Sequence, residues 1–227
     1  FSSIGDIVQS TSPLNTIRNA FPDSPITFLT LNTYAPLLEM HPDIDSLLSI
    51  KRKQSFRKLL DLRKYLHLKR FQVVYDLHNS IRSNILTYGI SKKIHRVKKP
   101  RLNRSRLFFF HINKFETDFS SLRLFHDNIG SIWKCKDEIP PTYLKISKFE
   151  KEKASRFLIS RGVERGFIAI VPGAAWSQKQ WSSKNYISTL HKLNLPAVIL
   201  GSKKDKICDE ISMGYNKAIN LAGKTDL

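Results

Sequence analysis

The sequence has 227 residues, of which 41% are hydrophobic and 25% are charged, and this composition excludes disordered, collagen-like and low-complexity proteins. No apolar run approaches the roughly 18 residues that a membrane-spanning helix needs. Lysine and arginine outnumber aspartate and glutamate by 38 to 19, so the formal net charge is +19.

The positive charge is concentrated in one part of the chain. Residues 51–111 hold eighteen basic and two acidic residues, a net of +16, whereas residues 1–50 carry a net of −4. Such a segment typically faces a polyanion: a nucleic acid, an anionic membrane or a phosphorylated substrate. A solvated, lysine-rich surface is the structural alternative.

The first half of the chain predicts alternating helices and strands. We expect helices over residues 13–21, 34–40, 54–68 and 80–88, and strands over 26–31, 44–50 and 71–77. The outward face of the 54–68 helix is basic and carries Arg57, Lys58, Arg63 and Lys64, while Phe56, Leu59, Leu60, Leu62, Tyr65 and Leu66 are expected to face inward. From residue 92 to 118 the pattern degrades into basic residues interleaved with phenylalanines. There we expect Phe108–Phe110 to form a core strand, with shallow membrane insertion as the alternative.

The second half predicts a further α/β unit. A helix over 120–129 and a connection after Pro140-Pro141 precede an expected domain boundary at residue 147. Helices are predicted over 148–161, 183–193 and 205–213, and strands over 167–171, 197–200 and 218–221. We therefore expect an α/β fold with domains 1–147 and 148–227, the second one incomplete. Because Phe1 is not a methionine and Leu227 closely follows a strand-like run, we expect a fragment.

The segment Ser2-Ser3-Ile4-Gly5-Asp6 precedes the first helix, where a parallel sheet binds its ligands. Gly5 is expected to allow a sharp turn, and Asp6 to present a carboxylate that can act as a general base toward a sugar hydroxyl. The structural alternative is that Asp6 only caps the helix.

A second candidate loop, residues 172–181, follows the strand predicted at 167–171. Gly173 and Ala174 keep this loop small, so that its N–H groups can approach an anion, while Ser177 and Lys179 can bind a diphosphate. It is neither a Walker nor a G-x-G-x-x-G motif. A strand-to-helix connection with packed tryptophans is the structural alternative.

A third group of polar residues, Asp76, His78 and Arg82, closes the strand predicted at 71–77. A histidine there is either a hydrogen-bonded structural residue or a substrate contact. No spacing of histidine, cysteine and carboxylates indicates a metal site. Cys135 and Cys208 are expected to be reduced thiols of a cytoplasmic protein.

These segments together resemble glycosyltransferase family 9, the lipopolysaccharide heptosyltransferases. The specific matches are S-S-I-G-D at residues 2–6 and P-G-A-A-W-S-Q-K-Q-W at 172–181. YDLHNSIRS at 75–83 and VILGSKKDKICDEI at 198–211 follow in the family's order. The resemblance implies the GT-B fold, in which two Rossmann-like domains face a cleft. It also implies inverting, metal-independent transfer of a heptose from ADP-heptose to the inner core of lipopolysaccharide, with no cofactor.

By position, Asp6 resembles the family's catalytic base and Lys179 its diphosphate-binding residue. Gly173, Ala174 and Ser177 are then expected at the donor. The expected contacts to an acidic lipid-linked acceptor are Ser3, Gly5, His78, Arg82, Arg57, Arg63 and Lys64. Such an enzyme would be cytoplasmic and peripheral on the inner face of the inner membrane, held by the anionic surface. The alternatives are a GT-B transferase that uses another nucleotide sugar and a basic nucleic-acid-binding module.

Overall fold

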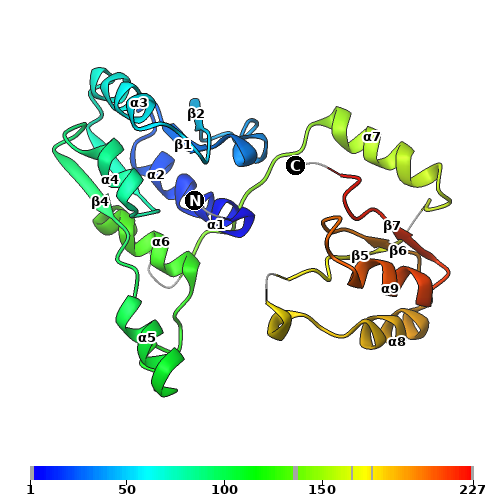
Figure 1. Cartoon of the computed structure of the whole chain (residues 1–227). Coiled ribbons are helices and arrows are strands. Elements are labelled where there is room, and N and C mark those ends of the chain that lie inside the picture. Colours follow the sequence, from blue (N-terminus) through cyan, green and yellow to red (C-terminus); the bar gives the residue numbers. More distant parts are fainter. Residues whose placement is uncertain (1–2, 135–137, 165, 175, 226–227) are drawn as a thin grey trace. The chain divides into compact units, whose positions relative to one another are not determined.

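The chain is an α/β protein in the computed structural model, which describes residues 3–134, 138–164, 166–174 and 176–225 (Figure 1). It divides into two compact units, Phe1–Lys145 and Ile146–Leu227. The break lies two residues before the boundary expected after residue 147. Cys135 is outside the described residues.

Unit 1 alternates helices with short parallel strands. Its elements are α1 (Ile4–Ser10), α2 (Ser12–Ala20), β1 (Thr27–Leu31), η1 (Asn32–Leu37), β2 (Ser46–Ile50), α3 (Phe56–Leu68), β3 (Val73–Asp76), α4 (Ile81–Thr87), β4 (Lys93–Arg96), α5 (Arg101–Phe110), α6 (Ser121–Ile129) and η2 (Gly130–Ile132).

The strands of unit 1 form two parallel pairs. β1 pairs with β2, from Thr27 opposite Ser46 to Leu31 opposite Ile50. β3 pairs with β4, from Val73 opposite Lys93 to Asp76 opposite Arg96. A helical connection joins the strands within each pair, as parallel pairing requires, so the carboxyl ends of the two strands in a pair lie at one edge.

A cavity of about 1050 Å³ is lined by all of β1 and β3 together with residues of α2, α3 and α4. No ladder between β1 and β3 is present among the described strands. Thr30 of β1 lines this cavity, and its buried hydroxyl lacks a hydrogen-bond partner within the described part of the chain. The two pairs of strands are therefore linked through side-chain packing.

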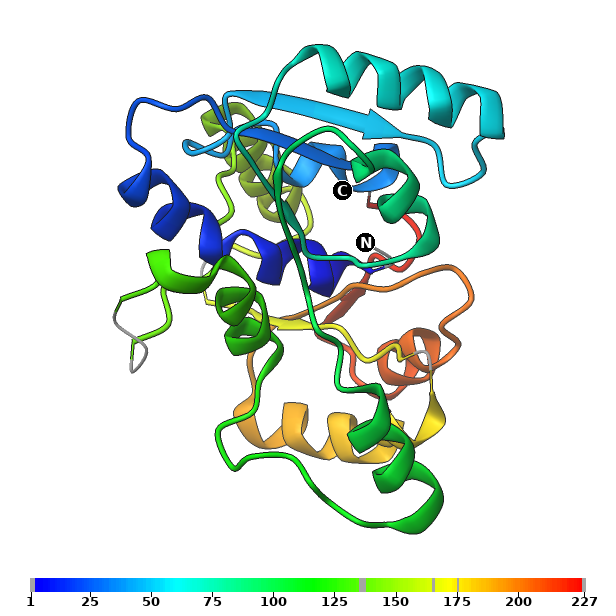
Figure 2. The same ribbon diagram turned by 90° about the vertical axis from the view of Figure 1, so that its left-hand side faces the viewer.

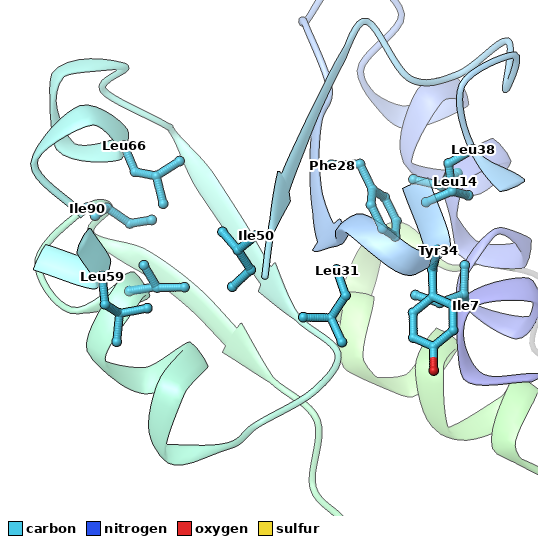
Figure 3. Close-up of a cluster of buried hydrophobic side chains, with 11 residues drawn as sticks. Ile7, Leu14, Phe28, Leu31, Tyr34, Leu38, Ile50, Leu59, Leu66 and Ile90 are labelled. Carbon is cyan, nitrogen blue, oxygen red and sulfur yellow. The ribbon is translucent and has the colours of Figure 1, made fainter. Parts of the chain in front are cut away.

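The main core cluster of unit 1 consists of aliphatic and aromatic side chains (Figure 3). The figure shows Leu59 and Leu66 of α3 together with Ile90 on one side, and residues of α1, α2 and β1 on the other. Ile7 and Leu38 are almost completely buried. Burying such a side chain contributes about 1.5–3 kcal/mol, so this cluster holds the first turn of α1 in place.

Unit 2 contains a three-stranded parallel sheet in the order β5-β6-β7. Its elements are α7 (Lys148–Ile159), β5 (Ile168–Ile170), η3 (Ser177–Lys179), α8 (Ser183–Leu193), β6 (Ala197–Ile199), α9 (Ile207–Gly214) and β7 (Ala218–Asn220). The central strand β6 is buried along its whole length. Leu190 of α8 and Ile211 of α9 pack in the core beside it.

Several elements of unit 1 differ from the sequence prediction. Helix α1 begins within the segment that was expected to precede the first helix. The region from 92 to 118, expected to lack regular structure apart from a core strand at Phe108–Phe110, contains β4 and α5. The core-strand prediction is wrong, because these three phenylalanines lie on α5 and are 68 to 76% exposed. Figures 1 and 2 both show α5 set apart from α1 to α4.

The prediction that Phe56 and Tyr65 face inward is also wrong, since both are exposed.

Candidate active site

The first candidate group lies at the N-terminus of α1. Ser3 is the N-cap, and its Oγ accepts a hydrogen bond from the N–H of Asp6 at 3.2 Å. Asp6 therefore occupies the first turn of the helix, where a carboxylate is favoured by the helix dipole. Gly5 lies inside α1 rather than in a sharp turn, so the turn expected of it is wrong. Ser2 is outside the described residues.

Asp76, at the end of β3, organises the turn that leads into α4. Its Oδ1 accepts hydrogen bonds from the N–H groups of His78 at 3.0 Å and Asn79 at 2.8 Å. Its Oδ2 accepts a hydrogen bond from the Ser83 hydroxyl at 2.8 Å. Because the side chain is buried and both oxygens are engaged, Asp76 acts as a structural anchor that fixes His78 at the sheet edge.

His78 and Lys99 lie within electrostatic reach of Asp6. Burial is the first cause that lowers the pKa of His78, and the Lys99 charge lowers it further, while Asp76 and Asp6 raise it. Burial likewise lowers the pKa of Lys99, Arg101 and Arg104 act in the same direction, and Asp6 and Asp76 oppose it. The chain thus gathers a carboxylate, a half-buried imidazole and a half-buried ammonium at one edge.

Lys99 is a candidate site residue that the sequence analysis did not single out. It follows β4, whose pairing with β3 brings the residues after Arg96 next to those after Asp76. The only signal in the sequence was its membership of the basic run. Because strand β4 was not predicted, the position of Lys99 beside His78 was not predicted either.

The basic residues predicted on α3 do not form one group. Arg57 and Lys64 are exposed, whereas Arg63 is half-buried, stacks over the Tyr88 ring at 5.0 Å and donates a hydrogen bond to the Tyr88 carbonyl at 2.9 Å. Tyr88 follows the end of α4, whereas His78 precedes its start. Since α4 spans about 10 Å, Arg63, which binds Tyr88 at one end of this helix, lies away from His78 at the other end. Arg82, in the first turn of α4, is half-buried and lines the β1–β3 cavity.

In unit 2, the residues predicted at the donor follow β5 directly. Gly173 and Ala174 lie in the loop, while Ser177 and Lys179 form η3 and are exposed. The packed tryptophans of the structural alternative are observed only in part: Trp176 is 67% exposed, whereas Trp181, 49% exposed, packs edge-to-face on Tyr186 with the ring centroids 5.0 Å apart. Ala175 is outside the described residues.

The loop after β5 lies against the loop after β6. A side chain at Gly173 would place its Cβ 2.7 Å from the Asp205 carboxylate, and one at Gly201 would lie 2.8 Å from the Cys208 sulfur. Asp205 in turn accepts hydrogen bonds from the N–H and the hydroxyl of Ser202 at 2.7 and 2.9 Å. Glycine is thus required for the two loops to pack this closely.

A third loop joins this edge after β7. The N–H of Gly223 donates a hydrogen bond to the Gly201 carbonyl at 2.7 Å, and Gly223 has φ +68°, a conformation that favours glycine. Lys203 packs against it. Three small, glycine-containing loops with nearby lysines therefore meet at the carboxyl edge of this sheet, as a phosphate-binding edge of an α/β fold requires.

The described residues include neither a cluster of metal ligands nor a helix that could span a membrane. No group of three histidine, cysteine, aspartate or glutamate side chains has a metal-binding arrangement within these residues. Their helices also include none that is long and apolar enough to cross a membrane. Cys208 is buried and not in a disulfide, and burial raises the pKa of its thiol.

Comparison with known proteins relates this chain to a family of glycosyltransferases. A family model described as glycosyltransferase family 9 (heptosyltransferase) matches residues 59–227. The lipopolysaccharide core heptosyltransferase OpsX of Haemophilus influenzae is 24% identical over 238 aligned residues, which include 100% of this chain and 66% of that protein. This chain thus spans just under two thirds of that relative.

Two solved structures share the fold. The glycosyltransferase family 9 structure from Veillonella parvula superimposes with a TM-score of 0.79 at 18% identity, covering 100% of this chain and 68% of that one. The E. coli ADP-heptose lipopolysaccharide heptosyltransferase II gives a TM-score of 0.71 at 23% identity, with 100% and 72% covered. The predicted fold class, α/β of the GT-B type, is confirmed.

Proposed function

The chain belongs to glycosyltransferase family 9, and from this premise we propose that the protein transfers a heptose from ADP-heptose to the inner core of lipopolysaccharide. The proposed reaction inverts the anomeric centre and uses no metal ion. The name of the H. influenzae relative supports the acceptor, and the name of the E. coli heptosyltransferase supports the donor.

The observation that carries this proposal is the placement of His78 and Lys99 after the paired strands β3 and β4, with Asp6 in electrostatic interaction with both. In the proposed step, the Asp6 carboxylate takes the proton of the acceptor hydroxyl as that oxygen bonds to the anomeric carbon. The carbon–oxygen bond to the diphosphate breaks on the opposite face, which inverts the configuration. The neutral imidazole of His78 and the Lys99 ammonium would orient the sugar and an acidic group of the acceptor. Ser3 and Gly5 keep their proposed place at the acceptor.

The leaving ADP carries a growing negative charge that must be stabilised. In our proposal, Lys179 supplies a positive charge to the diphosphate, Ser177 donates a hydrogen bond, and the loop at Gly173 and Ala174 offers N–H groups. Support comes from the close approach of Gly173 to the Asp205 side chain, which leaves no room for a larger residue in the present arrangement. These groups would act where other transferases use a divalent ion.

The acceptor in this proposal is an acidic, lipid-linked oligosaccharide at an anionic membrane surface. The basic segment of unit 1 supports it, with the exposed Arg57 and Lys64 and the half-buried Arg82 as contacts. Arg63 is the weakest of the proposed acceptor contacts, because its guanidinium is bound to Tyr88. We place the enzyme in the cytoplasm, peripheral on the inner face of the inner membrane.

A product assay tests this function. The purified protein is given a heptose-free lipopolysaccharide core with ADP-heptose, ADP-glucose or UDP-glucose, each with and without EDTA. We expect one heptose to be added from ADP-heptose alone, with inverted configuration by NMR and no loss of rate with EDTA. Transfer from another nucleotide sugar only would instead support a different GT-B transferase, and a loss of activity with EDTA would contradict the metal-independent step.

A further inference from the structure

Helix α5 differs from the other helices of unit 1 in burying none of its residues. Its N-cap is Pro100, and no side-chain cap is present among the described residues. Isolated helices of ten residues are marginal in water, because tertiary packing supplies most of the stability of a helix in a protein. The stability of α5 therefore calls for a contact that the other described residues of unit 1 do not provide.

The C-terminal turn of α5 is apolar on all sides. Phe108, Phe109 and Phe110 are consecutive and therefore point in three directions about 100° apart, and all three are 68 to 76% exposed. Leu107 and Ile112 extend the exposed apolar surface. A groove on a protein covers one face of a helix, whereas a helix end that is apolar on every side fits a surrounding apolar medium.

The rest of α5 and its flanks are basic. From residue 92 to 115 the sequence holds nine basic residues and no aspartate or glutamate. Lys98, Arg101, Arg104, Arg106 and Lys114 are exposed, and no ion pair joins any of them to a carboxylate within the described residues. This charge is complementary to an anionic surface.

We propose that α5 inserts the Phe108–Phe110 turn into an anionic phospholipid bilayer, with the arginines of its first two turns at the headgroups. Apolar side chains at one end and bases beside them combine the two signals that stable peripheral anchoring requires. The orientation of unit 1 on the membrane is then set by α5. The proposed insertion into an anionic bilayer does not depend on the proposed function; only the identity of the membrane, the inner membrane, does.

Vesicles test the insertion without donor or acceptor. The parent protein is sedimented with vesicles of phosphatidylethanolamine and phosphatidylglycerol, and with vesicles of phosphatidylcholine. We expect binding to the anionic vesicles, at least tenfold weaker for the Phe108→Ser, Phe109→Ser, Phe110→Ser triple variant. Arg101→Gln, Arg104→Gln, Arg106→Gln should also weaken binding and reduce its salt dependence. The matched control is Phe149→Ser on α7, also an exposed helical phenylalanine, which should bind like the parent.

A second measurement reports on depth and does not depend on the folding of the triple variant. In Phe109→Trp, fluorescence should shift to the blue with anionic vesicles and be quenched by brominated acyl chains. Unchanged emission of this tryptophan, equal binding of the parent to both vesicle types, or parent-like binding of a folded triple variant would each overturn the proposal. Because the vesicles contain no lipopolysaccharide, a failure here leaves the transferase activity intact, and the reverse also holds.

Discussion

Burial lowers the pKa of the Lys99 ammonium, and the carboxylate of Asp6, 93 positions earlier in the chain, raises it again. The same two neighbours act on His78: the charge of Lys99 lowers its pKa, and the charge of Asp6 raises it. A change in the charge of Asp6 therefore changes the protonation of His78 and of Lys99. This coupling can be measured directly.

The titration of His78 should report both neighbours with opposite signs. In Asp6→Asn the pKa of His78 should fall, because the attraction that favours the imidazolium is lost. In Lys99→Gln it should rise, because a repulsion is lost. The measurement is an NMR titration of the imidazole protons, with the exposed His111 as an internal reference. Shifts of equal sign in the two variants would contradict the arrangement.

Asp6→Asn should also lower kcat by roughly 10²- to 10⁴-fold, the usual contribution of a positioned general base. The affinity for ADP-heptose should change little, because the donor is proposed to bind unit 2. Steady-state kinetics and calorimetry with the donor check the two parts. Asp23→Asn, at an exposed carboxylate, is the matched control and should keep parent rates. Near-normal turnover of Asp6→Asn would remove the residue from the mechanism.

Lys179→Ala should weaken the binding of ADP by about tenfold or more, since a charge-assisted contact to a diphosphate contributes about 1.5–3 kcal/mol. The melting temperature should stay within a degree or two, because Lys179 is exposed on η3 and forms no ion pair within the described part of the chain. Lys184→Ala, five residues on and also exposed, is the control that should leave ADP binding unchanged. Equal affinities for the two variants would exclude Lys179 from the donor site.

Acidification should destabilise the protein through three histidines that are buried or half-buried. Burial is the main cause that lowers the pKa of His41, His78 and His126. In the unfolded chain these groups take up protons as the pH falls through about 6.5, while in the folded chain they stay neutral to lower pH. The unfolded state then binds more protons, so the free energy of unfolding decreases between about pH 7 and pH 5.

Urea denaturation at pH 7.5 and 5.5 measures this decrease. His126, fully buried beside Trp133 at a ring distance of 5.0 Å, is the most informative position. His126→Phe should lose less stability on acidification than the parent, whereas His111→Asn, at an exposed residue, should follow the parent. A parent protein that is equally stable at both pH values would contradict the prediction.

The sequence predicted unit 2 closely because its strands are short apolar runs. Ile168–Ile170 and Ala197–Ile199 are continuous runs of this kind, typical of parallel strands. β4 was not predicted because Lys93–Arg96 contains a single apolar residue, Ile94, and has no buried position. This strand is specified by its ladder with β3, a long-range interaction that no local pattern encodes.

The same reason limits what could be predicted of the site. Asp6 and Lys179 were chosen as candidates from local motifs, whereas the placement of Lys99 near His78 depends on the register of β3 and β4. Asp205 was missed because it reaches Gly173 only through the pairing of β5 with β6. Gly5 was assigned a turn because the capping of α1 by Ser3 begins the helix earlier than the pattern suggested.

The cavity between β1 and β3 also bears on how rapidly the backbone amides exchange their hydrogens with solvent. Within the described sheets, β6 has a ladder on both edges, whereas β1 and β3 each have one on a single edge. Along β1, alternate N–H groups therefore point toward β2 or toward the cavity, and the latter depend on burial alone for protection. Hydrogen exchange should leave β6 protected longest and divide the amides of β1 into a slow and a fast set that alternate along the strand.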